Sequence, residues 1–279
     1  MEEGDEMATR ARTKAKPQIK MQAKVIGEGA PLVLVPGGLT GWISWEPHAE
    51  RLSTNRKVIR VQLLNVQWGF EDKQLPSNYS VKTESRALAE TLSELGLTKP
   101  IDIVAWSYGA LVTLDYALEH PDSIRTLTLI EPPAFWVLRA TAGLDAEAQQ
   151  QAATLQTLHG DITEDQLEQF ALTVGLCPPK QPCRELPQWP LWVTYRRSVR
   201  NSPAVLEHED DIRRLRAFKH PVLLVKGTGS AKFLHQIIDV LAEQFPDAKV
   251  VEMPAGHAPH IVSKERFLEQ LAIFQGSAQ

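Results

Sequence analysis

Long apolar runs are absent from this chain of 279 residues. No hydrophobic stretch approaches the roughly 18–20 residues that a membrane-spanning helix needs. The N-terminal stretch MEEGDEMATRARTKAK also lacks the apolar segment of a secretory signal peptide. We therefore expect neither a membrane span nor a secretory signal. Because residues 1–16 are charged and contain no aromatic residue, we expect them to form a disordered tail.

A large excess of charge is absent as well. The chain has 30 Lys and Arg against 34 Asp and Glu, which gives a net charge of −4 at pH 7 and an isoelectric point near 6.1. Proteins that bind nucleic acid or an anionic membrane surface usually carry a basic patch or tract. The charge balance therefore favours neither nucleic acid nor a membrane as a partner.

Cysteine is scarce. The two cysteines, Cys177 and Cys183, lie in the segment CPPKQPC. They can pair with each other, but two cysteines do not make the disulfide framework of a small secreted domain. A chain of this length also buries a full core without cross-links. We therefore expect two reduced thiols and a cytoplasmic location.

The chain does contain a regular alternation of apolar strand patterns and helical patterns. Short strands that are apolar on both faces, such as residues 32–35, are typical of a parallel sheet covered by helices on each side. The sequence therefore predicts an α/β fold. We expect strands at residues 19–26, 32–35, 57–64, 101–104, 125–130, 221–226 and 249–253.

This alternation stops between residues 134 and 216. Helical patterns follow one another there, at residues 146–158, 163–174 and 205–215, and no strand pattern separates them. The alternation resumes at residue 221. We therefore expect residues 134–216 to form a helical cap, or lid, inserted into a core made of residues 17–133 and 217–279.

Ser107 stands in the segment Ala105-Trp106-Ser107-Tyr108-Gly109, between an expected strand and an expected helix. A sharp strand-to-helix turn with small residues flanking a serine is the nucleophile elbow of serine hydrolases. The turn holds the hydroxyl clear of the sheet, and the close passage of the backbone requires small neighbours, here Ala105 and Gly109. The pentapeptide alone is equally compatible with an ordinary exposed serine, because a motif needs its structural context.

A catalytic serine needs a histidine base, which should follow a strand at the carboxyl edge of the sheet. His257 directly follows the last strand, after Pro254-Ala255-Gly256, and His260 is its one serious rival. The remaining histidines fall in helices, helix ends or loops that follow no strand of the parallel set: His48, His120, His159, His208, His220 and His235. We expect His257 to be the base.

The base in turn needs an acid that orients it. The turn after strand 221–226, Gly227-Thr228-Gly229-Ser230, has no carboxylate, and Asp239 lies within the next helix. Glu131 ends strand 125–130 beside two prolines that fix the backbone, and it gives the chain order Ser, Glu, His. We therefore expect Glu131 to be the acid, with an ordinary surface carboxylate as the alternative.

The segment Pro36-Gly37-Gly38-Leu39 follows strand 32–35. Glycine lets a backbone N–H approach a ligand without a side chain in the way, which an oxyanion hole requires. A flexible turn is the alternative interpretation. The expected oxyanion donors are the N–H groups of Gly38 and of Tyr108, the residue after the nucleophile.

With these residues placed, the chain resembles the α/β-hydrolase fold superfamily from about residue 18 to its C-terminus. The resemblance rests on LVLVPGG, AWSYG, a strand that ends in Glu131, and PAGH, in that order. It implies a mostly parallel sheet flanked by helices, with a helical lid inserted after the sixth strand.

Most members of this superfamily place the acid, usually Asp, after the strand that residues 221–226 resemble. Glu131, 24 residues past the nucleophile, matches a minority arrangement found in haloalkane dehalogenases and in lactone hydrolases of the zearalenone hydrolase type. Dehalogenases and epoxide hydrolases use Asp as the nucleophile, so Ser107 argues against both. The lactone hydrolases have a similar Val-Pro-x-Gly-Leu oxyanion loop, and the usual His-Gly of the superfamily is here Pro36-Gly37.

The expected function is a serine hydrolase that cleaves a carboxylic ester or lactone of an apolar small molecule through an acyl-enzyme. No metal or organic cofactor is implied, and we expect a monomer or a homodimer. The alternatives are a C–C bond hydrolase, a thioesterase or a perhydrolase of the same fold, or a ligand receptor with a slow or inactive triad.

The expected substrate pocket combines the oxyanion loop with aromatic residues near the serine and in the lid. For any single aromatic residue, packing in the core or lid is the alternative interpretation. The candidates are Gly37, Leu39, Trp42, Trp106, Trp136, Trp189, Trp192 and Tyr195.

Overall fold

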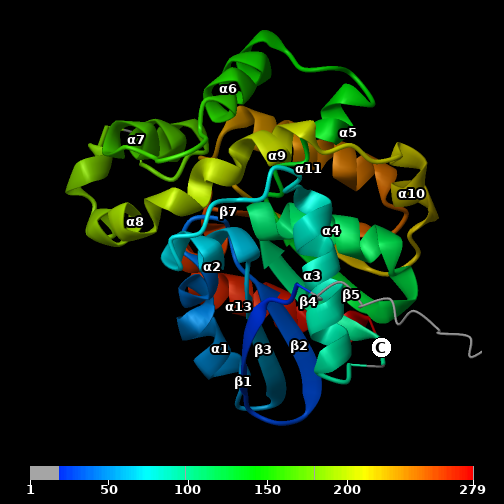
Figure 1. Cartoon of the computed structure of the whole chain (residues 1–279). Helices are drawn as coiled ribbons and strands as arrows, with labels where there is room; N and C mark the ends of the chain where they lie inside the picture. Colours follow the sequence, from blue (N-terminus) through cyan, green and yellow to red (C-terminus); the bar gives the residue numbers. More distant parts are fainter. Residues whose placement is uncertain (1–18, 98, 179, 279) are drawn as a thin grey trace, which may run out of the picture.

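A computed structural model describes residues 19–97, 99–178 and 180–278, so the expected tail at residues 1–16 lies outside the described residues (Figure 1). The centre of the fold is a seven-stranded sheet with the order β1-β3-β2-β4-β5-β6-β7. β1 pairs antiparallel with β3, and the other neighbouring strands pair in parallel. The strands span Gln22–Ile26 (β1), Ala30–Val35 (β2), Arg56–Gln62 (β3), Ile101–Trp106 (β4), Ile124–Ile130 (β5), Val222–Gly227 (β6) and Ala248–Met253 (β7). The predicted α/β fold with a mostly parallel sheet is confirmed.

The central strands are buried on both faces. Every residue of β4 is buried, and so are the last four residues of β2, which are Val and Leu. The exception to this apolar composition is Asp102 in β4. Its carboxylate pairs with the guanidinium groups of Arg56 and Arg125. It also accepts a hydrogen bond of 2.6 Å from Thr126 Oγ1. A buried charge is tolerated there because it is paired and hydrogen-bonded.

Helices cover both faces of the sheet, as Figure 1 shows. Leu32 and Leu34 of β2 contribute to the core cluster under α1 and α13, whereas Val33 and Val35 contribute to the core cluster under α3, α4 and α11. Successive side chains of a strand point to opposite faces, so an apolar strand serves both layers. The helices that flank the sheet are α1 (Glu46–Leu52), α3 (Val81–Glu94), α4 (Tyr108–Glu119), α11 (Lys232–Gln244), α12 (Pro259–Val262) and α13 (Lys264–Ser277). A further helix, α2 (Leu64–Phe70), follows β3.

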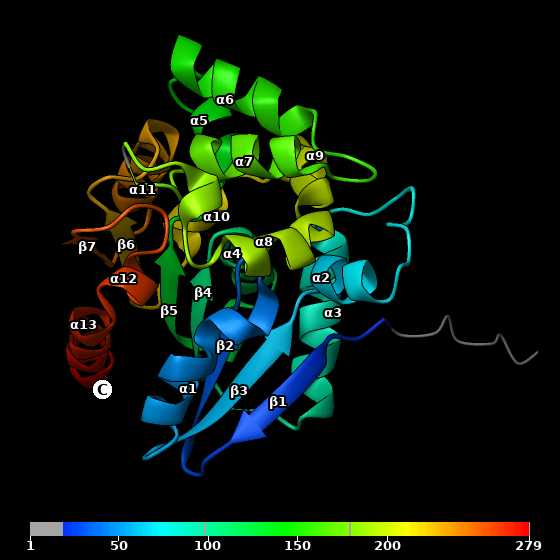
Figure 2. The same ribbon diagram turned by 90° about the vertical axis from the view of Figure 1, so that its left-hand side faces the viewer.

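Residues 134–216, called here the inserted segment, join β5 to β6. Figure 2 shows its helices beyond the carboxyl ends of the strands, since the arrowheads of β4 and β5 point toward them. In the described residues this segment follows the fifth strand of the sheet, so the expected position after the sixth is wrong by one strand. Its helices are α5 (Phe135–Arg139), α6 (Ala146–Gln156), α7 (Glu164–Thr173), α8 (Trp189–Tyr195), α9 (Ser202–Glu207) and α10 (Ile212–Ala217).

The single helix expected at residues 205–215 is divided into α9 and α10. The residues between them, from His208 to Asp211, are not helical. Asp211 begins α10, since its carboxylate accepts a hydrogen bond of 2.9 Å from the N–H of Arg213. Asp favours such capping positions over helix interiors, which explains the break in the helix.

Cys177 and Cys183 form a disulfide, with their Cα atoms 5.5 Å apart. The expectation of two reduced thiols is therefore wrong. The two cysteines are close because Pro178 and Pro182 lie in the short loop between them. The cytoplasmic location was inferred from reduced thiols, and the disulfide removes this support.

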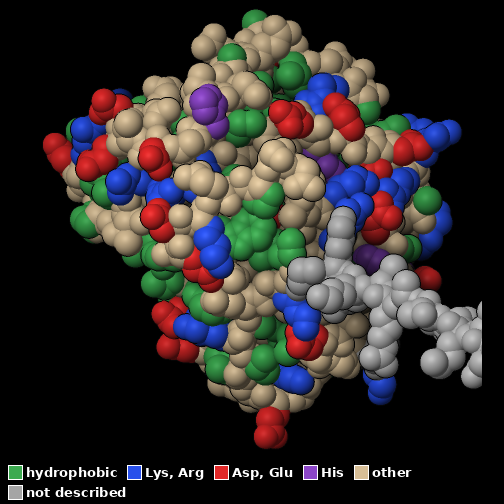
Figure 3. All heavy atoms as spheres, viewed as in Figure 1, with side chains coloured by type: hydrophobic (Ala, Val, Ile, Leu, Met, Phe, Trp, Pro, Cys, Tyr) green, Lys and Arg blue, Asp and Glu red, His purple; other side chains and the backbone are tan. Residues whose placement is uncertain are grey.

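The surface carries charges of both signs. On the face shown in Figure 3, Lys and Arg side chains lie beside Asp and Glu side chains. This mixture agrees with the small net charge of the sequence. Within the described ranges, none of the helices combines the length and the apolar character that crossing a bilayer requires.

Candidate active site

Ser107 lies in the turn between β4 and α4, with φ 53° and ψ −125°. A positive φ is unfavourable for a residue with a Cβ and is found where the surrounding structure imposes it. Position 109 requires a glycine, because a Cβ there would lie 2.1 Å from the carbonyl oxygen of Pro36 and 2.9 Å from Cγ1 of Val35. The backbone at Ser107 thus has the sharp form that an elbow requires.

His257 bridges Ser107 and Glu131. Its Nε2 lies 2.8 Å from Ser107 Oγ, and its Nδ1 lies 2.7 Å from Glu131 Oε2. An ionised carboxylate only accepts hydrogen bonds, so in the neutral imidazole Nδ1–H donates to Glu131 and Nε2 accepts from the serine hydroxyl. The structure therefore brings together the three side chains selected from the sequence, in the order serine, histidine and carboxylate.

Glu131 is fully buried and has a positive φ of 45°. Its Oε1 accepts a hydrogen bond of 2.7 Å from the N–H of Gly227 and another from the hydroxyl of Ser230. These donors come from the turn after β6, the turn that has no carboxylate of its own. They leave Oε2 directed at His257, and they satisfy the other oxygen of a buried carboxylate. Asp239, the alternative acid, is an exposed partner of Lys226 at 3.0 Å.

The loop that carries His257 is fixed by two backbone contacts. The N–H of His257 donates to the carbonyl oxygen of Gly175 in the inserted segment at 2.9 Å. The indole N–H of Trp106 donates to the carbonyl oxygen of His257 at 2.7 Å. Trp106 was expected only as a wall of the pocket, and no local sequence pattern indicates its contact with His257.

His260, the rival base, is a core residue. It is fully buried against Trp45, Trp106 and Phe267, and neither ring nitrogen forms a hydrogen bond with the residues that the structure describes. Burial lowers the pKa of His260 well below its usual range, with smaller contributions from His48 and His257. The imidazole is therefore neutral and packs as an aromatic ring.

Gly38 and Tyr108 both line the cavity in front of Ser107. A Cβ on Gly38 would lie 3.3 Å from the Cβ of Tyr108, so a side chain at residue 38 would crowd the segment of Tyr108. Asn65 holds the segment of Gly38, since its Nδ2 donates to the carbonyl oxygens of Gly38 at 3.4 Å and Ser198 at 2.7 Å.

Sequence reasoning missed Glu84. Its carboxylate is hydrogen-bonded to Asn65, which contacts Gly38, and to Tyr79, which contacts Tyr108. Its carboxylate accepts hydrogen bonds of 2.8 Å from the N–H groups of Leu64 and Asn65 and one of 2.7 Å from the hydroxyl of Tyr79. The hydroxyl of Tyr79 also lies 2.8 Å from that of Tyr108. A signal was present in the sequence, because Glu84 falls four residues before Leu88 on the apolar face of α3.

Burial raises the pKa of Glu84 to about 7, although the hydrogen bonds from Tyr79, Leu64 and Asn65 act in the opposite direction. The cause is desolvation, since the side chain is fully buried and an ionised carboxylate loses its hydration there. Glu84 is therefore a titratable group near neutral pH that lies behind the candidate oxyanion loop.

The cavity in front of Ser107 is mainly apolar. Its floor is made by the elbow and the oxyanion loop, and its roof is made by helices of the inserted segment and by α11. Besides Ser107, Tyr108, Gly38 and His257, the lining comprises Gly37, Leu39, Trp106, Pro133, Leu155, Phe170, Val174, Leu176, Val199, Asn201, Ser202, Val205, Phe233 and Leu234.

Three of the expected pocket residues, Gly37, Leu39 and Trp106, line this cavity, and the other five do not. Trp42 lies under the ammonium group of Lys24. Tyr195 packs edge-on against Phe70. The structure therefore does not place Trp42, Trp136, Trp189, Trp192 and Tyr195 in the lining of this cavity, and a role for them in substrate binding stays a prediction.

The tryptophans of the inserted segment stabilise that segment internally. Trp189 and Trp192 are buried in an edge-to-face pair, and Trp136 is fully buried with its ring 6.5 Å from that of His208. The cavity wall is instead aliphatic, with Phe170 and Phe233 as its phenylalanines. Large aromatic rings fill the interior of a small helical layer most effectively, which accounts for this placement.

Two known hydrolases resemble this chain, one along most of its length and one along less than half. The chain is 28% identical over 254 residues to a pimeloyl-[acyl-carrier protein] methyl ester esterase from Chromobacterium violaceum, which covers 89% of this chain and 95% of that protein. It is 33% identical over 124 residues to 2-hydroxy-6-oxo-2,4-heptadienoate hydrolase from Pseudomonas putida, an alignment that spans 43% of this chain and less than half, 44%, of that relative.

Solved structures give the same result for the fold. A thermophilic esterase from Thermogutta terrifontis superimposes with a TM-score of 0.71 at 20% identity, covering 92% of this chain and 93% of that one. A family model described as alpha/beta hydrolase fold matches residues 30–264. Together with the sheet order and the elbow, this match establishes that the chain belongs to the alpha/beta hydrolase fold family.

Proposed function

We propose that this protein is a serine hydrolase that cleaves a carboxylic ester or lactone of a small apolar molecule. The observation that carries the proposal is the position of His257, within hydrogen-bond distance of both Ser107 Oγ and Glu131 Oε2. A serine hydroxyl is a weak nucleophile unless a positioned base takes its proton, and this geometry supplies such a base.

The reaction follows from the positions of these groups. Ser107 Oγ attacks the substrate carbonyl carbon while His257 Nε2 takes the hydroxyl proton, and Glu131 stabilises the imidazolium that forms. The N–H groups of Gly38 and Tyr108 stabilise the negative charge that develops on the carbonyl oxygen, each by about 2.7–4 kcal/mol.

The second half of the reaction regenerates the serine. His257 returns the proton to the leaving alcohol as the carbon–oxygen bond breaks, which leaves an acyl group on Ser107. The same histidine then takes a proton from water, which attacks the acyl carbon, and the proton passes to Ser107 as the acid is released. The chain's own side chains and backbone supply each of these steps.

The inserted segment acts as a lid over this site in our proposal. The cavity is bounded by the core below and by the inserted segment above, with Leu155, Phe170 and Val205 among its roof residues. Its volume is about 50 Å³, compared with the roughly 10–15 Å³ that one water molecule needs. In our proposal, the roof helices move apart to admit a larger substrate.

Replacement of Ser107 by alanine tests the proposal. Hydrolysis of short-chain p-nitrophenyl esters should fall by about 10³-fold or more in Ser107→Ala, because only binding and oxyanion stabilisation remain. Ser93→Ala, which removes an exposed hydroxyl on α3, is the matched control and should keep full activity. Retention of wild-type activity by the Ser107→Ala protein would refute the proposal.

A C–C bond hydrolase is the second candidate. The 33% identity to a relative named as a hydrolase of 2-hydroxy-6-oxo-2,4-heptadienoate supports it, although that alignment spans less than half of each chain. The mainly aliphatic cavity favours an ester with an apolar acyl or alcohol group over a substrate that carries carboxylates. Steady-state assays with matched ester, thioester, lactone and β-diketone substrates separate these classes.

A further inference from the structure

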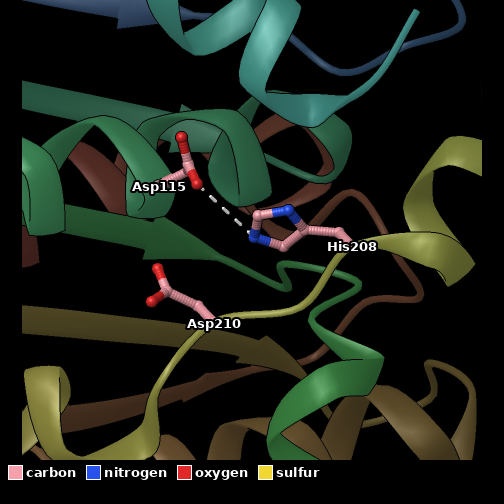
Figure 4. Close-up of side chains that lie close together, drawn as sticks. All are labelled: Asp115, His208 and Asp210. Atoms are coloured by element: carbon pink, nitrogen blue, oxygen red, sulfur yellow. Dashed lines mark ion pairs between the residues drawn. The ribbon is translucent and has the colours of Figure 1, made fainter. Parts of the chain in front are cut away.

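Three potential metal ligands meet at the junction of the inserted segment and the core. Asp115 lies on α4, whereas His208 and Asp210 lie in the link between α9 and α10. Figure 4 shows the Asp115 carboxylate and the His208 ring pointing toward each other, with the Asp210 carboxylate nearby. One ligand atom from each lies within 4.8 Å of the others. His208 Nε2 and Asp115 Oδ1 are 3.6 Å apart, close to the roughly 3.4 Å between neighbouring ligands of a tetrahedral zinc ion with bonds of about 2.0–2.1 Å.

Asp115 is a buried carboxylate that lacks a hydrogen-bond donor. Its exposed fraction is 2%, and Oδ1 accepts no hydrogen bond from the residues that the structure describes. The nearest ammonium group, Lys82 Nζ, is 3.9 Å away, beyond hydrogen-bond distance, and also pairs with Glu119 at 3.5 Å. A buried carboxylate oxygen without a hydrogen bond is unfavourable, so this oxygen favours a cation in the space that it faces.

His208 supplies a ring nitrogen to the cluster. Its side chain is buried, and Nε2 is the ring atom that faces Asp115 Oδ1. An imidazole nitrogen is a common ligand of transition-metal ions.

The link that carries the other two ligands is already held in place. Arg214 Nη1 donates to both oxygens of Asp210, at 2.9 and 3.1 Å, and Arg139 Nη2 donates to the carbonyl oxygen of His208 at 2.8 Å. Hydrogen bonds of this kind orient the ligands of metal sites. Arg214 also pairs with Glu119 at 3.1 Å, so its charge is divided between the cluster and a neighbouring carboxylate.

We propose that Asp115, His208 and Asp210 bind one divalent transition-metal ion of the Zn²⁺ type, which fastens the inserted segment to α4. One imidazole and two carboxylates form an established class of ligand set for such ions, with water completing the coordination. The site is distinct from the Ser107 site, and its role is to hold the two parts of the molecule together.

Calorimetric titration with Zn²⁺ tests this site. The untagged full-length chain, freed of metal with a chelator, should bind one Zn²⁺ per chain. His208→Gln and Asp115→Asn should each raise the Kd by about 100-fold or more, because each removes one ligand. His159→Gln, which changes an exposed histidine of the same inserted segment, is the control and should bind as the wild type does.

Thermal unfolding gives an independent measurement. At a Zn²⁺ concentration a hundredfold above Kd, the Tm of the wild type should rise by about 5 °C, and the rise should be absent in Asp115→Asn. Asp115→Asn also removes the buried charge, so its metal-free Tm should be no lower than that of the wild type. The proposal is overturned if the wild type binds no Zn²⁺ at about 100 μM, or if His208→Gln binds it with an unchanged Kd.

Discussion

Among single residues, Glu131 shows how the surroundings of a side chain decide what it can do. It is fully buried, its backbone has a positive φ, and one oxygen is occupied by donors from the turn after β6. The other oxygen faces the imidazole of His257. Because Glu131 lies after β5 and the donors to its carboxylate lie after β6, two neighbouring turns together orient this carboxylate toward His257.

Replacement of Glu131 by glutamine should lower kcat for ester hydrolysis by about 10³–10⁴-fold. The amide cannot stabilise the imidazolium, and it favours the wrong tautomer of His257. The measurement is steady-state kinetics on p-nitrophenyl esters, with folding checked by circular dichroism. Asp239→Asn is the matched control, because Asp239 pairs with Lys226 at the surface. A large loss in that variant, with Glu131→Gln active, would show that the acid is misassigned.

Glu84 should make the stability of the protein depend on pH. Its pKa is about 7 in the folded protein, against 4.5 as the ordinary value, so between these pH values the folded state binds more protons than the unfolded state. Stability from this group is therefore present below about pH 4.5 and decreases as the pH rises to 7, by about 3 kcal/mol in total.

Urea unfolding of the wild type and of Glu84→Gln at several pH values between 4.5 and 8 measures this effect. The difference in unfolding free energy between the two proteins should shift in favour of Glu84→Gln as the pH rises. A difference that stays constant over this range would show that Glu84 does not titrate near neutral pH. The variant should also lower kcat, since Glu84 supports the segments of both candidate oxyanion donors.

Among the structural elements, the stretch between α7 and α8 connects the inserted segment to the candidate base. Gly175 accepts a hydrogen bond from the N–H of His257, and the disulfide between Cys177 and Cys183 closes the loop that follows. Gly175 has a φ of +77°, and its carbonyl oxygen would lie 2.3 Å from a Cβ on Gly256, so this contact depends on two glycines.

Removal of the disulfide should destabilise the protein moderately. The cysteines are separated by 6 positions in the sequence, and closing a loop this short contributes about 2 kcal/mol in the chain-entropy model. The double variant Cys177→Ser/Cys183→Ser should therefore unfold at a lower urea concentration than the oxidised wild type. The wild type in the presence of reductant should behave like the variant, and equal stability of all three would contradict the expectation.

For the molecule as a whole, the parts that were predictable depend on local sequence. Strands and the residues directly after them follow from apolar runs and chain order, which is why Ser107, Glu131 and His257 could be selected before their distances were known. The helices α6 and α7 of the inserted segment were also visible as patterns, whereas α5, α8 and the break between α9 and α10 were not expected.

The features that were missed depend on contacts between distant residues. Trp136, Trp189 and Trp192 face the interior of the inserted segment instead of the cavity, and no local pattern determines which side a helix turns toward the core. The contacts of Glu84 with Asn65 and Tyr79 join α3 to two loops. The disulfide depends on the path of a proline-rich loop, which spacing alone did not settle.

The central claim is that Ser107 is a nucleophile activated by His257, and covalent labelling tests it most directly. A fluorophosphonate probe should modify one residue per chain, located at Ser107 by peptide mass spectrometry, and a turned-over ester should compete with it. Labelling should be absent in Ser107→Ala and slowed by orders of magnitude in His257→Ala. Undiminished labelling of Ser107→Ala, or a wild type that hydrolyses esters without any label at Ser107, would contradict the account.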